Sequence, residues 1–102
     1  MKIAIRADAS AAIGSGHVMR CLSLADALRA RGETVIFLSR DMPAHLAQWV
    51  VERGHRLAPL PADATGECRD AAVAREAAAA YDWIVVDHYA LGIHWERAVR
   101  GE

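Results

Sequence analysis

Apolar and polar positions alternate along this chain with two different periods. Short apolar runs at residues 3–5, 35–38 and 83–86 are bounded by polar residues, as in buried strands. Between them, apolar residues recur at every third or fourth position, as in helices that bury one face. The pattern predicts strands over residues 1–6, 34–38, 55–60 and 83–87, and helices over 17–31, 44–53, 69–80 and 93–100.

Strands that alternate with helices are typical of a parallel sheet covered on both faces. We therefore predict an α/β, Rossmann-like, doubly wound fold. The first helix should bury a stripe formed by Val18, Cys21, Leu22, Ala25 and Leu28. Gly32 and Gly54 are placed to end the first two helices.

Polar residues follow the predicted strands. Asp8 comes after the first strand, residues 39–41 (Ser-Arg-Asp) after the second, and residues 87–89 (Asp-His-Tyr) after the fourth. Ligands of such sheets bind outside the carboxyl ends of the strands. We therefore expect these residues to collect at one edge and form part of a binding site.

The turn Gly14-Ser15-Gly16-His17 lies between the first strand and the first helix. Glycines allow a sharp turn and a close approach of ligand to backbone. The start of the helix offers unpaired N–H groups and the positive end of its dipole to an anion. His17 is the one side chain in the turn that titrates near neutral pH, which makes it a candidate general base.

Length and composition narrow the class of protein. The chain has 102 residues, is 54% hydrophobic and 25% charged, and carries a formal charge of −1. These values predict one globular domain over residues 1–102 and give no reason to expect binding to nucleic acid or to a membrane surface. Arg6 and Asp8 interrupt the apolar N-terminus, so we expect no signal peptide and a cytoplasmic protein.

Several other chemistry-bearing residues have simpler explanations. Cys21 and Cys68 lack the spacing of metal ligands, and Asp87 and His88 should point to opposite sides of a strand end, so we expect no metal or cofactor. Asp87 is then expected to cap the next loop. Residues 69–76 should form a solvated helix face. The tryptophans are expected in the core or between domains, and three histidines on the surface: Trp49, Trp83, Trp95; His45, His55, His94.

Residues 3–10 and 13–25 closely resemble the N-terminus of the UDP-sugar hydrolases of the pseudaminic-acid pathway. The related spore-coat polysaccharide biosynthesis proteins are similar too. Residues 84–89, Ile-Val-Val-Asp-His-Tyr, resemble a second motif of that family. The resemblance covers most of the chain, although residues 59–67 contribute little.

The resemblance implies the N-terminal half of a two-domain fold of the glycosyltransferase B type. The active site would lie in the cleft with a C-terminal domain, outside this chain, that holds most of the nucleotide. The implied reaction is metal-independent hydrolysis of a UDP-linked diacetamido-trideoxy-hexose (the altropyranose isomer) to UDP and free sugar, with inversion. We expect the chain alone to be inactive, and its uncovered half-cleft to favour self-association.

The resemblance implies that His17 is the catalytic base. Asp8 is expected either to orient His17 or to bind a sugar hydroxyl, and Arg20 either to contact a phosphate or to pair with an acid. The full set expected to bind substrate is Asp8, Gly14, Ser15, Gly16, Arg20 and Tyr89. Two other functions stay open: a glycosyltransferase that uses an acceptor hydroxyl in place of water, and a domain that binds ligand without turnover.

Overall fold

The computed structural model describes residues 1–10, 14–88 and 90–101. Eight elements alternate along the chain: β1 (Lys2–Arg6), α1 (Gly16–Ala30), β2 (Thr34–Ser39), α2 (Ala44–Glu52), β3 (Arg56–Pro59), α3 (Glu67–Ala77), β4 (Trp83–Val86) and α4 (Ile93–Arg100). Each predicted element is present. The largest shift is in α3, which begins two residues earlier and ends three residues earlier than predicted, because residues 78–80 form the turn toward β4.

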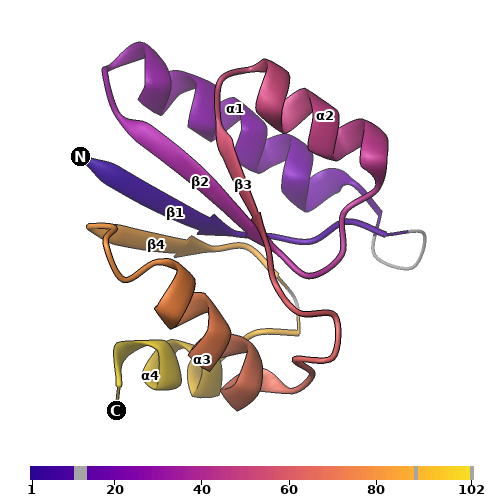
Figure 1. Cartoon of the computed structure of the whole chain (residues 1–102), viewed down its shortest axis with the longest axis vertical. Helices are drawn as coiled ribbons and strands as arrows, with labels where there is room; N and C mark the ends of the chain where they lie inside the picture. Colours follow the sequence, from indigo (N-terminus) through magenta and orange to yellow (C-terminus); the bar gives the residue numbers. More distant parts are fainter. Residues whose placement is uncertain (11–13, 89, 102) are drawn as a thin grey trace.

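The four strands form one parallel sheet in the order β3-β2-β1-β4. Helices α1 and α2 cover one face, and α3 and α4 cover the other (Figure 1). The α/β doubly wound prediction is therefore confirmed. From β1 the chain first builds outward through β2 and β3, then crosses back to place β4 on the other side of β1. The point where the strand order reverses, between β1 and β4, is the usual ligand position in such sheets.

Successive side chains of β1 pack in two different hydrophobic cores, one on each face of the sheet, as the two-residue period of a strand requires. Ile3 and Ile5 pack with Phe37 against α1 and α2, whereas Ala4 faces α3 and α4. The predicted stripe of α1 lies in the first of these cores, with Leu28 partly buried at its margin. Gly32 and Gly54 have φ of 87° each and follow α1 and α2, as predicted.

One prediction about a single residue is wrong. His55 is buried rather than exposed, because its ring packs 6.0 Å from that of Phe37 and its Nε2 lies 2.8 Å from Asp26. Trp95 belongs to the core, which is one of the two positions expected for the tryptophans. Trp49 and Trp83 are 43% and 62% exposed, so for them a position between domains stays a prediction. Among the described residues, no helix is both long enough and apolar enough to cross a membrane.

Candidate active site at the carboxyl edge of the sheet

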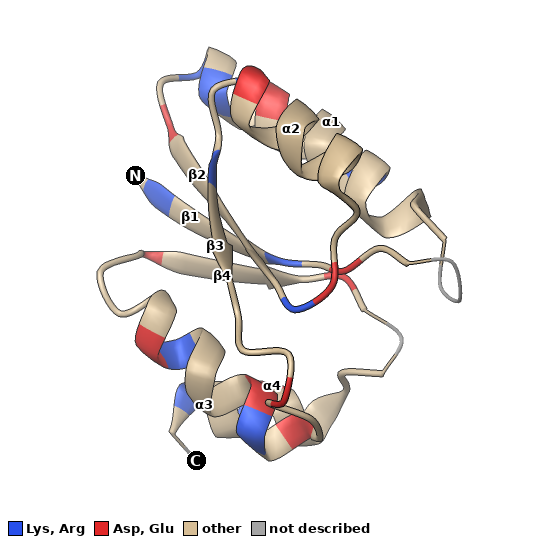
Figure 2. Ribbon diagram, turned by 45° about the vertical axis from the view of Figure 1, so that its right-hand side comes forward, with Lys and Arg blue, Asp and Glu red and all other residues tan. Residues whose placement is uncertain are grey.

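The segments that follow all four strands converge at the carboxyl edge of the sheet. Figure 2 shows acidic and basic residues side by side where β1 and β2 end. A pocket of about 380 Å³ opens there, lined by Asp8, Ser10, Arg40, Asp41, Ala62 and His88. The expected collection of polar residues at one edge is therefore present.

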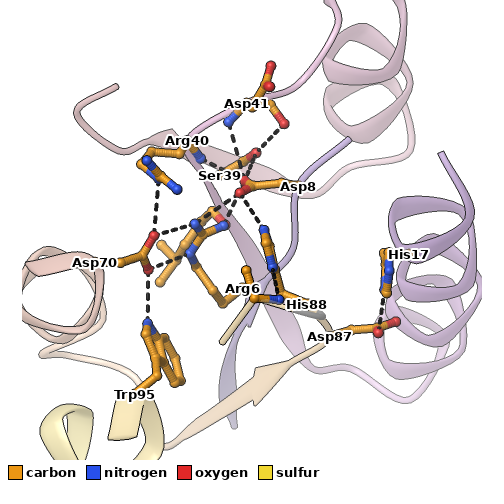
Figure 3. A network of polar contacts seen from close by, with 12 residues as sticks. Arg6, Asp8, His17, Ser39, Arg40, Asp41, Asp70, Asp87, His88 and Trp95 are labelled. Atoms are coloured by element: carbon orange, nitrogen blue, oxygen red, sulfur yellow. Dashed lines mark hydrogen bonds and ion pairs between the residues drawn. The ribbon is translucent and has the colours of Figure 1, made fainter. Parts of the chain in front are cut away.

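Arg6, the last residue of β1, anchors this edge from below with a fully buried guanidinium (Figure 3). Its Nη1 lies 2.7 Å from Asp8, and its Nη2 lies 2.6 Å from Asp70 on α3. Trp95 of α4 donates its indole N–H to the same Asp70 carboxylate over 2.9 Å. Burial alone would lower the pKa of Arg6, but the hydrogen bonds to Asp70 and Asp8 outweigh it and raise the pKa.

Asp8 organises the segment after β2. Its Oδ1 accepts hydrogen bonds from Ser39 Oγ (2.9 Å) and from the backbone N–H groups of Arg40 (2.8 Å) and Asp41 (3.2 Å). Burial would raise the pKa of Asp8, but Arg6 and these donors lower it to about 2. The Asp8 oxygens are thus occupied by protein donors, so the carboxylate holds the pocket wall in place.

His17 and Asp87 form a closely bonded pair across the reversal in strand order. His17 lies in the first turn of α1 and is buried, and Asp87 follows β4 directly. The distance from His17 Nδ1 to Asp87 Oδ1 is 2.6 Å (Figure 3). Burial would raise the pKa of Asp87, but hydrogen bonds from His17 and Arg20 lower it, so the carboxylate is ionised at neutral pH.

The short bond to a carboxylate assigns the Nδ1 proton of His17, because an ionised Asp87 can only accept. Arg20 Nη2 lies 3.2 Å from His17 Nδ1 and 3.2 Å from each Asp87 oxygen. With Nδ1 protonated, the Arg20 contact is a charge interaction with Asp87 rather than a bond to the ring. In the neutral form of the ring this tautomer leaves the lone pair on Nε2, the form that a general base requires.

Cys21, one turn along α1, lies on the other side of Asp87. Its Sγ is 3.8 Å from Asp87 Oδ2, within reach of a weak S–H hydrogen bond. Burial, followed by the nearby Asp87 charge, raises the pKa of the Cys21 thiol to about 11. The thiol therefore stays protonated and supports Asp87 as a donor, and its burial agrees with the prediction that Cys21 belongs to the buried stripe of the first helix.

His88 has a different environment from that of His17, although their rings are stacked at 6.5 Å. Its Nε2 lies 3.0 Å from Asp8 Oδ2, and its Nδ1 accepts the backbone N–H of Ala90 over 3.0 Å. Both ring nitrogens are therefore engaged within the protein. His88 thus connects Asp8, which follows β1, with the loop after β4.

Four of the other predicted site residues lie on α1 or in the turn that precedes it. Gly14, with φ of 74°, lies in the turn before α1; Ser15 is the N-cap of that helix; and Gly16 is its first residue. Arg20 is largely exposed and pairs with Asp87, which is the second of the two roles expected for it. Tyr89 lies outside the described residues.

The structure excludes one of the two roles expected for Asp8 and corrects the expectation for Asp87. The residue bonded to His17 Nδ1 is Asp87, and not Asp8, which is bonded to Arg6, Ser39 and His88. Asp87 was expected to cap a loop, but its position directly after β4 brings it to the start of α1. Sequence periodicity alone could not pair these two residues, because they are 70 positions apart.

Sequence reasoning also missed the buried ion cluster beneath the pocket. Asp70 was assigned to a solvated helix face, yet it is fully buried and also lies 3.2 Å from Arg40 Nε. One signal was available: Arg6 follows the apolar residues 3–5 at the end of β1, and arginine is almost never fully buried without a partner. That signal indicates that a carboxylate is needed nearby without identifying which one.

Within the described ranges, no group of three or more histidine, cysteine, aspartate and glutamate side chains is placed to hold a metal ion. The chain was also compared with known proteins. No protein-family model, no curated protein and no solved structure matches it. The site must therefore be interpreted from its own geometry.

Proposed function

We propose that this chain carries the sugar-side half of a UDP-sugar hydrolase, with His17 as general base and Asp87 as the residue that positions it. The observation that carries the proposal is the 2.6 Å bond between His17 Nδ1 and Asp87, set where the strand order reverses. A carboxylate bonded to one imidazole nitrogen fixes the tautomer and stabilises the imidazolium that forms when the other nitrogen takes a proton.

In the proposed reaction, His17 Nε2 removes a proton from a water molecule as the water oxygen bonds to the anomeric carbon. The bond from that carbon to the diphosphate oxygen breaks, and UDP leaves with its electron pair. Because water attacks from the face opposite the leaving group, the anomeric configuration inverts. A diphosphate is a good leaving group, so one base together with stabilisation of the departing charge is sufficient.

The sequence resemblance supports the same function. Its two most specific stretches are residues 13–25 and 84–89, which lie far apart in the chain. His17 comes from the first stretch and Asp87 from the second, and these are the residues that meet at the edge of the sheet. On this proposal the chain is the N-terminal half of a glycosyltransferase B type fold, and the nucleotide is held mainly by a second domain.

A glycosyltransferase would use the same base, with an acceptor hydroxyl in place of water. The direct test incubates the natural full-length protein with the UDP-linked diacetamido-trideoxy-hexose, a chelator and no acceptor. We expect release of UDP together with free sugar of inverted configuration, followed by NMR. UDP release that requires an added hydroxyl acceptor would indicate a transferase, and no release under either condition would contradict both enzymes.

Replacement of Asp87 tests the positioning role. Asp87→Asn should lower kcat roughly 10²- to 10⁴-fold with little change in KM, because the amide no longer selects the tautomer or stabilises the imidazolium. The acidic limb of the pH–rate profile, which reports the pKa of the base, should also move. The matched control is Asp26→Asn. Asp26 lies toward the C-terminal end of α1, far from the site, and is bonded to another histidine, His55. Equal losses in the two variants would refute a specific role for Asp87.

A further inference from the structure

The pocket beside the His17–Asp87 pair has its own polar chemistry. Its lining residues follow each of the four strands: Asp8 and Ser10 after β1, Arg40 and Asp41 after β2, Ala62 after β3, and His88 after β4. His88 separates the pocket from His17, and the two rings are stacked 6.5 Å apart. A molecule of modest size seated in the pocket would therefore extend over His88 toward the base.

Two charged side chains of the pocket wall, Arg40 and Asp41, have polar atoms that form no hydrogen bond with the described part of the protein. Arg40 Nε lies 3.2 Å from Asp70 in an ion pair without hydrogen-bond geometry, and among the described residues no hydrogen bond or ion pair is found for the two Nη groups of Arg40. Asp41 is exposed, and across the same described ranges its carboxylate makes no hydrogen bond or ion pair. By contrast, Asp8 and His88 are both bonded within the protein. The wall thus offers one strong donor and one strong acceptor.

The charge balance around the pocket disfavours an anion. Three carboxylates, Asp8, Asp41 and Asp70, face two guanidinium groups, Arg6 and Arg40, and Arg6 is already bonded to two of the carboxylates. A phosphate near Arg40 would also lie near the uncompensated Asp41. A neutral ring that carries both hydroxyl donors and a carbonyl acceptor satisfies both groups without that repulsion.

We propose that this pocket binds the neutral acetamido-sugar ring of the substrate, with Asp41 accepting from a hydroxyl or amide N–H and Arg40 donating to an acetamido carbonyl. The identity of the ligand as a sugar rests on the proposed function. The pocket is within the size range of small-molecule sites, and its walls are held rigid by the bonds of Asp8. Arg40 and Asp41 are then residues that determine substrate specificity.

The test is a ¹⁵N–¹H NMR titration of this chain with N-acetylglucosamine as a neutral acetamido probe and with inorganic phosphate as an anionic probe. N-Acetylglucosamine should shift the amides of Ser10, Arg40 and Asp41, and the shifts should saturate. Asp41→Asn should weaken binding of the sugar about tenfold, the loss expected of one hydrogen bond to a charged group. The same variant should strengthen any binding of phosphate, because it removes a repulsive charge.

Glu52→Gln, an isosteric loss of charge at the far end of α2, is the matched control and should leave both titrations unchanged. A second variant, Arg40→Gln, should also weaken sugar binding, and thermal melts of all variants report on the fold. The proposal is overturned if the sugar shifts no pocket amide up to its solubility limit. It is equally overturned if phosphate alone binds, or if Asp41→Asn leaves sugar binding unchanged.

The outcomes separate this inference from the proposed function. UDP release that depends on His17, with no sugar binding at Arg40 and Asp41, would refute the pocket assignment alone. Sugar binding at the pocket, with no release of UDP by the full-length protein, would refute the hydrolase and leave a sugar-binding site.

Discussion

Two adjacent residues, Asp87 and His88, bond to residues on opposite sides of the site. Asp87 turns toward α1 and bonds His17, while His88 turns toward β1 and bonds Asp8. This follows from the alternation of side chains in extended backbone. The result is two Asp–His pairs with crossed partners, of which one supports the wall of the pocket and the other has the geometry of a base and its positioning carboxylate.

Acid should unfold this protein through its low-pKa carboxylates. The pKa of Asp8 is about 2 in the fold and near 3.8 without it, so Asp8 adds roughly 2 kcal/mol of stability above pH 4. That contribution is lost as the pH falls from about 4 to about 2, and the lowered pKa of Asp70 adds a loss of the same sign. Urea unfolding followed across this range measures the slope.

The control for the acid prediction is a pair of variants. Asp8→Asn should flatten the dependence of unfolding free energy on pH, whereas Asp63→Asn, in the exposed loop before α3, should keep the wild-type slope. A wild-type slope in Asp8→Asn would show that Asp8 is not a source of the acid sensitivity.

Arg6 should be the most sensitive charged residue for stability. Arg6→Met leaves the buried carboxylates Asp8 and Asp70 without their main partner, which should cost about 3–5 kcal/mol of unfolding free energy. Arg69→Met, at an exposed position beside Asp70, should change it by less than about 0.5 kcal/mol. Chemical denaturation of both variants checks the prediction, and similar losses would contradict it.

At the scale of elements, α1 is preceded by a turn that favours glycine and begins without a side-chain cap hydrogen bond from Ser15. Gly14 has φ of 74°, where a side chain is unfavourable, whereas Gly16 is helical and a Cβ there would meet no atom within 4 Å. The glycine before the helix therefore shapes the chain, and the structure gives no packing reason for the second one. Gly16 is the glycine to examine for a ligand contact.

The two glycines should respond differently to alanine. Gly14→Ala should lower the unfolding free energy by about 1 kcal/mol, because it forces a left-handed conformation on a residue with a Cβ. Gly16→Ala should leave it unchanged or raise it by up to about 1 kcal/mol. Thermal melts measure both. Destabilisation by Gly16→Ala would contradict the helical start of α1, and a loss of turnover in a stable Gly16→Ala would report a ligand contact.

Helices α3 and α4 are coupled to the site through one buried carboxylate. Asp70 of α3 accepts from Trp95 of α4 and from Arg6 of β1, so the second layer of helices is tied to the sheet beneath the pocket. This polar tie explains why a helix of small alanine side chains holds its position on the sheet. Asp70 thereby holds Arg6, beneath the pocket, through bonds that involve β1, α3 and α4.

At the scale of the whole molecule, the periodic pattern was sufficient to predict all eight elements and the parallel sheet. It also predicted that Asp8, Arg40 and Asp87 would share one edge, because carboxyl ends of parallel strands share an edge. It could not predict which carboxylate bonds which base. That pairing depends on strand order and on the direction of single side chains, and His17 and Asp87 meet because β4 lies next to β1.

The most direct measurement compares UDP release by the wild-type full-length protein with release by His17→Ala, each checked for folding by circular dichroism. Loss of a general base should lower kcat roughly 10²- to 10⁴-fold while the melting temperature stays close to that of the wild type. His45→Ala, an exposed histidine on α2, should retain wild-type turnover. Near-wild-type turnover by a folded His17→Ala would contradict the assignment of His17 as the base.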